Sequence, residues 1–248
     1  MKVTVVTAVL NRARTLAECL ASVAAQTHRD VEHVLIDGGS TDGSVELIRA
    51  KTVPGHWVSE PDAGLYAAIN KGIAAATGDV IGILGADDVY ASSDVLERVA
   101  AVLSRTGADA CHGDLEYVSD ADPGRLVRRW IAGPYVRGSM RFGWMPPHPT
   151  FFVRREQYQR LGTYDTRLRI AADYELLLRF IQRHRISLEY LPSVLVRMRT
   201  GGASNSPRNL ARKTLEDWRA WRMNGLSGGT LAVVGKNLRK APQLLPWR

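Results

Sequence analysis

The sequence predicts an α/β protein with a doubly wound, mainly parallel sheet. Over residues 1–122, short apolar segments rich in β-branched residues alternate with segments whose apolar residues recur at helical spacing. Such alternation is typical of parallel strands joined by right-handed helical crossovers. Polar residues stand where the apolar segments end, and ligands bind at that edge of such a sheet.

Each element of this first half follows from a local pattern. Strands are expected where β-branched and other apolar residues run together, and helices where apolar residues are three or four positions apart. Gly78 is placed to end one helix, and Ser93 to cap another. The expected strands span 2–7, 34–36, 56–58, 80–84 and 108–111, and the expected helices span 14–26, 44–51, 65–76 and 94–104.

The alternation changes after residue 122. An apolar face containing Leu176 and Phe180 predicts a helix, and the prolines on both sides of His148 exclude a helix there. The expected strands span 125–131, 150–153 and 188–196, the expected helix spans 172–183, and 134–143 is expected to be short helix or loop.

The net charge of +8 is unevenly distributed and follows the expected domains. A domain over 1–204 divides into an acidic half, 1–122, with net charge −9, and a basic half, 123–204, with net charge +10. A joint at 201–206 leads into a basic helical tail, 205–248, with net charge +7. An acidic half argues against a nucleic-acid binder, whose charge should form a continuous basic footprint. The basic parts suit an anionic partner or membrane surface, and solvated surface arginines explain them equally well.

Composition excludes several other classes. The 248 residues can bury a full core without staples, and the two cysteines are too far apart in sequence for a disulfide framework or a CxxC zinc site. No apolar run reaches the roughly 18 residues of a membrane-spanning helix. The chain runs from Met1 directly into an expected strand, without the pattern of a signal peptide. We therefore expect a cytoplasmic protein.

The candidate site residues begin with carboxylates at the ends of expected strands. Asp87 and Asp88 follow the strand at 80–84 and can hold a hard divalent cation that leaves positions open for phosphate oxygens. Asp37, followed by two glycines, could accept a ring N–H of a flat nucleobase. Asn11 ends the first strand, where no GxGxxG motif follows, which disfavours a dinucleotide-dependent dehydrogenase. Ordinary turn chemistry explains any one of these residues alone.

Four segments in one order resemble a known family. They are Thr7-Ala8-Val9-Leu10-Asn11, the segment from Asp37 to Gly43, the segment from Ser59 to Gly72, and Ala86-Asp87-Asp88. Together they resemble family 2 glycosyltransferases with the GT-A fold, particularly the bacterial branch that builds exopolysaccharides and cell-envelope glycans. The resemblance covers roughly residues 1–200.

The resemblance implies a nucleotide-diphospho-sugar donor, with a UDP- or GDP-sugar favoured, and Mn²⁺ or Mg²⁺ as cofactor. It implies inversion at the anomeric carbon and transfer to a hydroxyl of a glycan or lipid-linked glycan. Asp88 would be the main metal ligand, although the usual DxD motif reads here as Ala86-Asp87-Asp88. Many members have Asp-Asp where this chain has Asp37-Gly38. The residues expected to bind the donor are Thr7, Ala8, Val9, Asn11, Asp37, Asp62, Asn70, Lys71, Asp87 and His148.

The resemblance also places the catalytic base in the second half. Asp173, at the start of the helix at 172–183, matches the family's catalytic carboxylate, and the preceding residue, often Glu in the family, is Ala172 here. An inverting transfer needs one such group to take the proton of the acceptor hydroxyl. His148 matches a histidine beside the diphosphate and is expected either to bind the metal or to donate to phosphate. Asp114 is a weaker candidate on the acceptor side.

The basic tail leaves two interpretations open. Leu210, Leu215, Trp218 and Trp221 could form the apolar face of a surface helix at the anionic inner face of the plasma membrane. Alternatively, this face packs on the catalytic domain or on a second subunit, so that an oligomer is also open. Two other functions compete with the glycosyltransferase: a nucleotidyltransferase, and a non-catalytic relative that only binds a nucleotide-sugar.

Overall fold

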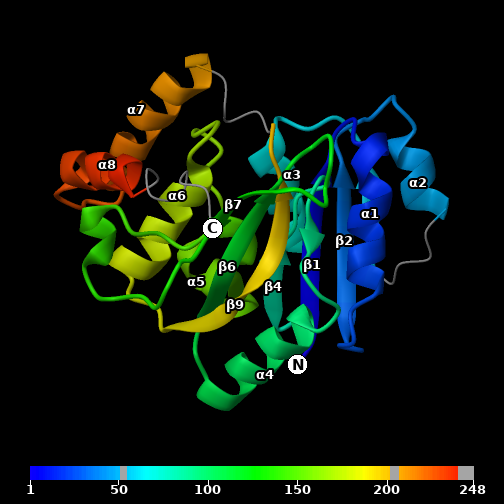
Figure 1. Ribbon diagram of the computed structural model, residues 1–248, viewed down its shortest axis with the longest axis horizontal. Helices are drawn as coiled ribbons and strands as arrows, with labels where there is room; N and C mark the ends of the chain where they lie inside the picture. Colours follow the sequence, from blue (N-terminus) through cyan, green and yellow to red (C-terminus); the bar gives the residue numbers. More distant parts are fainter. Residues whose placement is uncertain (51–54, 202–206, 240–248) are drawn as a thin grey trace.

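The computed structural model describes residues 1–50, 55–201 and 207–239. Within these residues, nine strands form one sheet with the order β3-β2-β1-β4-β8-β6-β9-β5, and β7 pairs with β6 (Figure 1). The strands are β1 (Val3–Val9), β2 (Val31–Asp37), β3 (Trp57–Ser59), β4 (Val80–Ile83), β5 (Val89–Tyr90), β6 (Ala110–Val118), β7 (Leu126–Trp130), β8 (Phe152–Arg154) and β9 (Leu188–Arg199).

The α/β class is confirmed, and the sheet is more mixed than predicted. Strands β3, β2, β1 and β4 are parallel, as the alternating pattern of the first half requires. The short strand β8 then inserts between β4 and β6 and is antiparallel to both, while β6 and β9 are parallel to each other. The second half therefore joins the sheet through a strand that reverses its direction. The weak alternation after residue 122 reflects that break.

The helices cover both faces of the sheet. Core residues of α3, including Ile69 and Ile73, pack with Val6 of β1 on one face, and those of α1 and α4, including Cys19 and Leu96, pack with Val5 on the other. The helices are α1 (Ala13–Ala24), α2 (Ser44–Ala50), α3 (Leu65–Ala75), α4 (Val95–Thr106), α5 (Arg155–Leu161), α6 (Ala172–Leu177), α7 (Pro207–Met223) and α8 (Gly229–Leu238). Short 3₁₀ turns, η1 (Ser139–Phe142) and η2 (His148–Thr150), and a π-helical segment, η3 (Leu178–Arg183), complete the chain.

The C-terminal helices belong to the body of the protein. Trp221 of α7 is 1% exposed and lies in the same core as Tyr174 of α6, whose hydroxyl accepts the indole N–H at 2.9 Å. Ala232 of α8 is buried in that core too, and α8 contacts η1. Figure 1 shows α7 and α8 beside α6, on the opposite side of the sheet from α1 and α2. The second interpretation of the tail, packing on the catalytic domain, therefore describes α7 and α8.

The expected joint at 201–206 and the expected apolar position of Leu210 are not tested here. Residues 202–206 and the side chain of Leu210 lie outside the described residues. Among the helices that are described, none combines the length and apolar character needed to cross a bilayer.

Candidate active site

Asp37 is the last residue of β2 and is completely buried. One of its oxygens, Oδ2, accepts the backbone N–H groups of Gly39 and Ser40, each at 3.0 Å, and the hydroxyl of Ser59 at 2.7 Å. Burial raises the pKa of Asp37, but these hydrogen bonds outweigh it and hold the pKa below its ordinary value. The other oxygen, Oδ1, is buried without a partner among the described residues. Asp37 is thus an ionised carboxylate, and its Oδ1 is still able to accept a hydrogen bond.

The loop after β1 is tied to the loop after β2. The amide oxygen of Asn11 accepts the N–H of Thr41 at 3.0 Å, and the backbone N–H of Asn11 donates to the hydroxyl of Ser40 at 2.8 Å. Asn11 has φ +51°, a left-handed conformation that Asn tolerates better than most residues. Asn11 therefore fixes the relative position of two loops at the same edge of the sheet.

Asp62 and Lys71 lie beside this loop pair. A Cβ added to Gly38 would be 3.8 Å from the Cβ of Asp62, which places Asp62 next to Asp37's own turn. The ammonium of Lys71 pairs with the carboxylates of both Asp62 and Glu60. Lys71 is thus neutralised by two acidic partners, and Asp62 is 5% exposed at its side chain.

Asp87 and Asp88 follow β4 in a turn built around Gly85. Asp88 is 4% exposed, and its Oδ1 accepts the backbone N–H of Arg199, at the end of β9, at 3.2 Å. Burial, helped by the adjacent charge of Asp87, raises the pKa of Asp88 to about 8. The guanidinium of Arg12 lies 3.8 Å from Asp87, whose side chain is 34% exposed. A Cβ at Gly85 would lie only 2.6 Å from Oδ2 of Asp88, so any side chain at this position would displace the carboxylate.

The carboxylate pair fits a hard divalent cation. Asp88 is buried with one backbone donor and a charged neighbour, so a cation would relieve the cost of ionising it. Oxygen donors of this kind suit Mg²⁺ or Mn²⁺, which are held in many phosphate-binding sites by one or two carboxylates together with substrate phosphates. Among the described residues, no three His, Cys, Asp or Glu side chains gather as a ligand set. His148 therefore does not form a three-ligand set with Asp87 and Asp88 in this conformation.

The second carboxylate centre lies at the start of α6. Oδ2 of Asp173 is 3.2 Å from Nδ1 of His148, which η2 holds between two prolines. Oδ1 accepts the N–H of Tyr174 at 2.8 Å and lies 3.5 Å from the hydroxyl of Tyr66. The Tyr66 ring stacks on Tyr164 with centroids 5.5 Å apart. Burial raises the pKa of Asp173, but the charges of His148 and two lysines outweigh it and lower the pKa.

Those two lysines come from the C-terminal helices. Lys213 of α7 and Lys236 of α8 lie close enough to Asp173 and His148 to affect both electrostatically. Lys236 is 6% exposed, pairs with Asp217 at 2.9 Å, and lies 3.9 Å from the centre of the Tyr174 ring. Burial lowers the pKa of Lys236, and Asp217 opposes that effect. The tail therefore contributes positive charge to the surroundings of the predicted base.

Another residue of α7 caps the helix that carries Asp173. Helix α6 has no capping side chain of its own at Ala171. Instead, Oε2 of Glu216 accepts the N–H groups of Ile170 at 2.8 Å and Ala171 at 3.0 Å. A carboxylate at a helix N-terminus satisfies free N–H groups and opposes the helix dipole. Glu216 thus fixes the first turn of α6.

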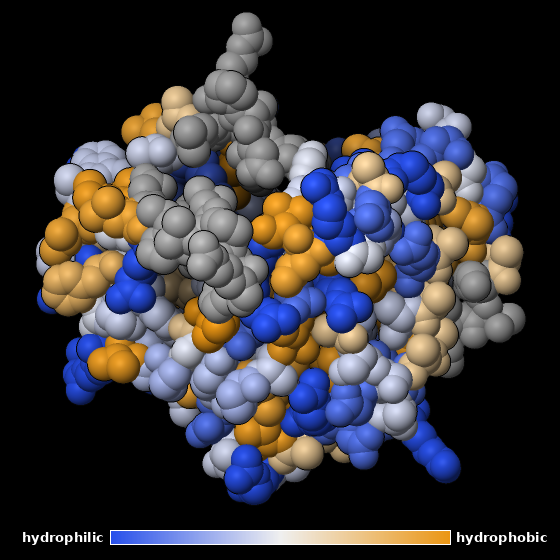
Figure 2. All heavy atoms as spheres, in the orientation of Figure 1, coloured by the Kyte–Doolittle hydropathy of each residue, from blue (hydrophilic) through white to orange (hydrophobic). Residues whose placement is uncertain are grey.

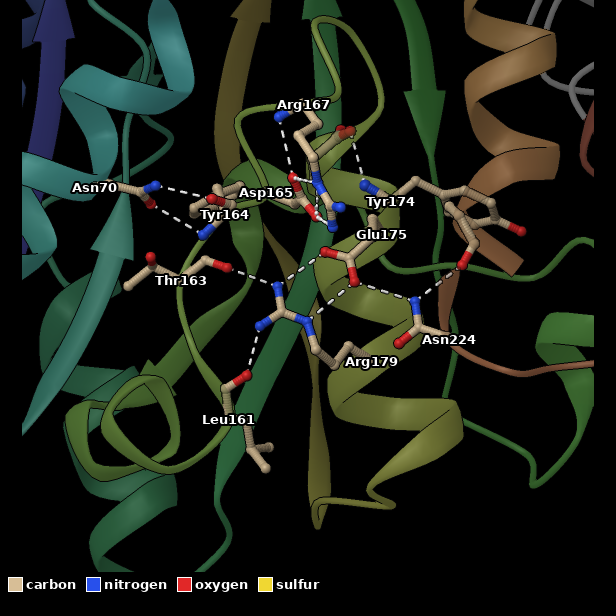
Figure 3. Close-up of polar contacts among 12 residues, drawn as sticks. Asn70, Leu161, Thr163, Tyr164, Asp165, Arg167, Tyr174, Glu175, Arg179 and Asn224 are labelled. Carbon is tan, nitrogen blue, oxygen red and sulfur yellow. Dashed lines mark hydrogen bonds and ion pairs between the residues drawn. The ribbon is translucent and has the colours of Figure 1, made fainter. Parts of the chain in front are cut away.

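A buried ion pair holds the other end of this region (Figure 3). Glu175 and Arg179 pair along α6 and η3, and the guanidinium also donates to the carbonyls of Leu161 and Thr163 at 2.5 and 2.6 Å. The amide of Asn224, after α7, donates to Glu175 at 3.1 Å. This network ties α6 to α5 and α7, in agreement with the structural role that the spacing of Glu175 and Arg179 suggests.

The side chain of Asn70 is hydrogen-bonded to the backbone of Tyr164. Its amide donates to the carbonyl of Tyr164 at 2.8 Å and accepts the N–H of Tyr164 at 2.9 Å (Figure 3). Both polar atoms of the side chain are therefore used in attaching α3 to the segment that leads to α6.

The two carboxylate centres border a common region. Burial raises the pKa of Tyr117, on β6, and Arg128 opposes it; the charges of Asp88 and Asp173 both add to the rise. Tyr117 is therefore within electrostatic range of both aspartates. On the other side, the loop containing Asn11 and Arg12 connects the Asp37 turn to Asp87. Asp37, Asp87 and Asp88 thus lie at the same edge of the sheet, joined through the loop after β1.

The remaining predicted donor residues lie deeper in the sheet. Thr7 is fully buried and its hydroxyl is 3.0 Å from Nε2 of His33. Val9 is 2% exposed and its carbonyl accepts the N–H of Gly38, while Ala8 is partly buried. The segment that carries these three residues supports the turn at Asp37. Asp114 is also buried and accepts the hydroxyl of Tyr190 at 2.9 Å.

Several site residues had no sequence signal. Lys213, Glu216 and Lys236 lie on helices whose packing on α6 cannot be recognised from spacing within the tail. Tyr66 lies in the segment from Ser59 to Gly72 that carries the family resemblance, but its contact with Asp173 depends on a fold of distant segments. Glu216 lies on a helix that the sequence predicts, but its role as a cap depends on a contact with Ile170 and Ala171 at the start of another helix, which the sequence does not indicate.

The arrangement of strands and helices defines the class: this is a GT-A-type glycosyltransferase fold. It resembles the structure of S. aureus TarS 1-349 in complex with UDP-GlcNAc, with a TM-score of 0.69, 15% identity, and coverage of 98% of this chain and 73% of that one. It also resembles the mannosyltransferase PcManGT from Pyrobaculum calidifontis in complex with GDP-Man and Mn²⁺, with a TM-score of 0.64, 19% identity, and coverage of 97% and 75%. A longer TarS structure is covered over 43% of its length.

The sequence identifies the family within this class. The family model for glycosyl transferase family 2 matches residues 4–170, and the chain belongs to that family. A PGL/p-HBAD biosynthesis glycosyltransferase of Mycobacterium bovis (strain BCG / Pasteur 1173P2) is 33% identical over 203 residues, covering 79% of this chain and 77% of the relative. An uncharacterized glycosyltransferase of Nostoc sp. is 35% identical over 189 residues, covering 70% and 57%. The predicted family is confirmed, and the nucleotidyltransferase and non-catalytic alternatives are set aside.

Proposed function

We propose that this glycosyltransferase is a metal-dependent, inverting enzyme that uses a UDP- or GDP-sugar. The observation that carries the proposal is the buried Asp88, which lies beside Asp87 after β4 and has one backbone donor. Relatives by fold have been solved with UDP-GlcNAc and with GDP-Man and Mn²⁺, which supports this class of donor.

The nucleoside would bind at the Asp37 turn. The free Oδ1 of Asp37 is suited to accept a ring N–H of the base, and the loop fixed by Asn11 would position the nucleoside next to it. Asp62, paired with Lys71, would form one side of this pocket. Thr7, Ala8 and Val9 would support the turn from below, and Asn70 would hold α3 in place.

The diphosphate would lie next to Asp87 and Asp88. These two carboxylates would hold Mn²⁺ or Mg²⁺, which supplies Lewis-acid stabilisation of the charge on the departing diphosphate. Arg12, near Asp87, would contact the same group. Across the site, the acceptor hydroxyl would lose its proton to a base built on Asp173 as its oxygen attacks the anomeric carbon opposite the leaving group.

Donor binding tests the proposal directly. A thermal-shift screen with UDP and GDP, each with and without Mn²⁺, should show stabilisation that depends on both nucleotide and metal, because a ligand of the native state raises its stability. Asp88→Asn should remove the metal dependence, and Asp30→Asn, at an exposed loop position, should keep it. Nucleotide binding that is identical with and without Mn²⁺ in the wild-type protein would contradict metal dependence.

We also propose that the acceptor is a glycan or lipid-linked glycan, reached from an anionic membrane surface at the inner face of the plasma membrane. Trp221 is buried, but α8 exposes Leu231, Val234 and Leu238 on one side, with exposed fractions of 54%, 51% and 68%. Figure 2 shows hydrophobic side chains gathered at the left of the molecule, over α7 and α8. Liposomes containing anionic lipid should co-sediment with the wild-type protein and less with Leu231→Ser/Leu238→Ser. Equal sedimentation of both proteins would contradict the membrane contact.

A further inference from the structure

We propose that Arg129 of β7 and Arg197 of β9 bind a negatively charged group of the acceptor, a phosphate or a carboxylate carried by a sugar. The proposal rests on the proposed function and names the class of acceptor for the same site. Its basis is that one buried glutamate, Glu116 of β6, holds both guanidinium groups while some of their N–H groups have no partner among the described residues.

Glu116 fixes the two arginines in position. Its side chain is 10% exposed, whereas those of Arg129 and Arg197 are 43% and 50% exposed. Oε1 of Glu116 accepts the Nε–H of Arg129 at 3.0 Å and also a hydrogen bond from its Nη2, while Oε2 accepts the Nε–H of Arg197 at 3.2 Å. A single carboxylate thus pairs with two cations, and one positive charge is left uncompensated within this group of three residues.

The remaining N–H groups suit an anion with two oxygens. Within the described part of the chain, Nη1 and Nη2 of Arg197 and Nη1 of Arg129 have no hydrogen-bond partner. A guanidinium presents its donors in a fixed plane that matches two oxygens of a carboxylate or phosphate. Because Glu116 already holds the Nε atom of each arginine, less side-chain freedom is lost when an anion binds.

The arginines lie in a cross-strand row that begins next to Asp88. Arg197 is opposite Val89 of β5 and also opposite Glu116, and Glu116 is in turn opposite Arg129. Figure 1 shows β9, β6 and β7 close together. Adjacent strands are about 4.8 Å apart, so the row extends over about 14 Å from β5 to β7. An anion bound to this row therefore lies within one sugar or two of the carboxylates after β4.

The row lies on the side of the sheet on which α6 packs. Ala110 of β6 belongs to the same core as Tyr174 of α6, whereas Leu115 belongs to the core shared with α1 and α4. Side chains alternate along a strand, so Glu116 is on the side of Ala110. The helix that carries Asp173, the proposed base, is therefore on the same side of the sheet as the two arginines.

The place of the row in the sheet assigns it to the acceptor rather than to the nucleotide. Asp37, where the nucleoside would bind, ends β2, and β2, β1 and β4 are neighbours in the sheet. Strands β6, β7 and β9 lie beyond β4 in the opposite direction. The donor would thus extend from Asp37 to the diphosphate at Asp88, and the arginines would meet what lies past the diphosphate.

Binding of matched sugars to the full chain tests the proposal without requiring turnover. The probes are glucose 6-phosphate, glucuronate and uncharged glucose, each added to the protein with UDP or GDP and Mg²⁺. The Nε–H NMR signals of Arg129 and Arg197 should shift with at least one anionic sugar and not with glucose. The sugar that causes the shift tells a phosphate from a carboxylate. No shift with either anionic sugar, or an equal shift with glucose, overturns the proposal.

Substitutions separate the paired N–H donors from charge alone. The Kd of the anionic sugar should rise about tenfold to 10²-fold in Arg197→Gln, which loses a charge-assisted hydrogen-bonded pair. Arg197→Lys should also bind more weakly than the wild type, because an ammonium cannot form two parallel bonds. Arg129→Gln serves as a second variant if Arg197→Gln does not fold. Arg105→Gln, at an exposed position on α4, should keep the wild-type affinity. Wild-type affinity in Arg197→Gln and Arg129→Gln overturns the proposal.

Nucleotide binding distinguishes the acceptor from the donor. A tenfold loss of UDP or GDP affinity in Arg197→Gln would assign the arginines to the diphosphate. Binding of UDP-glucuronate at least tenfold tighter than UDP-GlcNAc, lost in Arg197→Gln, would assign them to the donor sugar. Either result overturns the assignment to the acceptor and leaves the proposed function intact. A wild-type protein that shows no thermal shift with UDP or GDP and Mn²⁺ contradicts the proposed function itself, whatever the anionic sugars do.

Discussion

Two aspartates at the same edge of one sheet, Asp37 and Asp88, are held in opposite ways. Asp37 receives three hydrogen bonds on one oxygen, and its pKa is lowered; Asp88 receives one from Arg199, and its pKa is raised to about 8. Both are nearly or fully buried, so burial alone does not decide the outcome. The two differ in the number of hydrogen-bond donors and in the neighbouring charge of Asp87, which raises the pKa of Asp88 further. Asp37 keeps one oxygen without a partner among the described residues, and at Asp88 the proposed cation would compensate a charge that has a single backbone donor.

Removing the charge of Asp88 should have the largest effect on activity. Asp88→Asn is expected to lower turnover by about 10³-fold, because it takes away the proposed cation ligand, and the cation would stabilise the leaving diphosphate. The protein should remain folded, since a buried carboxylate with one donor contributes little to stability. Turnover with UDP-GlcNAc or GDP-mannose and the melting temperature, measured side by side, check both statements. Turnover near the wild-type level would contradict the proposed role of Asp88, and the two aspartates would then not differ in function as proposed.

Displacing Asp88 without changing its charge should have a smaller effect. In Gly85→Ala the new Cβ would collide with Oδ2 of Asp88, so the carboxylate must move. A misplacement of about 1 Å costs on the order of 10²-fold in turnover. Gly107→Ala, at a glycine with φ +70° and open space around it, is the matched control and should affect stability alone. Equal turnover losses in both variants would remove the geometric explanation.

Acid unfolding should distinguish the two aspartates. A lowered folded-state pKa means that Asp37 contributes stability above its ordinary pKa and loses it as the pH falls below about 4. Glu32, with its pKa lowered to about 2 by hydrogen bonds from Thr4 and Thr77 that outweigh its burial, behaves in the same way. The free energy of unfolding of Asp37→Asn should therefore depend less on pH between about 4 and 2 than that of the wild type. Denaturant titrations at several pH values measure this, and an unchanged slope would contradict it.

The smallest effect is expected from one donor to Asp37. Ser59→Ala removes the hydroxyl hydrogen bond to Oδ2 but leaves the two backbone donors. A single hydrogen bond of this kind stabilises a protein by about 1 kcal/mol. Urea unfolding of Ser59→Ala and Ser92→Ala, the latter at an exposed position outside the site, should show the larger loss for Ser59→Ala.

The first half of the fold was predictable because its signals are local. Each parallel strand and each helix there has its own apolar pattern, and the carboxylates stand at the end of β2 (Asp37) or in the turn after β4 (Asp87 and Asp88). In the second half, β7, β8 and β9 lie on segments that were expected to be strands. The antiparallel direction of β8, a strand of three residues between β4 and β6, depends on its neighbours and could not be predicted from its own sequence.

The candidate site was predictable to the same extent. Asp173 and His148 could be named from resemblance, but their surroundings could not. His148 of η2, Tyr66 of α3, and Lys213 and Glu216 of α7 reach the start of α6 from three separate parts of the chain. Trp221 shows why the tail was ambiguous. Its spacing with Trp218 suits a membrane-facing helix as well as a buried one, and only packing against Tyr174 decides for the buried side.

The cap that Glu216 places on α6 limits how this protein can be shortened or recombined. A chain cut before α7 would leave the amides of Ile170 and Ala171 without their acceptor and the indole pocket around Tyr174 open to water. The C-terminal helices therefore cannot be traded between relatives as an accessory module. A chimera that keeps the helix bearing Asp173 must also inherit the segment that closes its first turn.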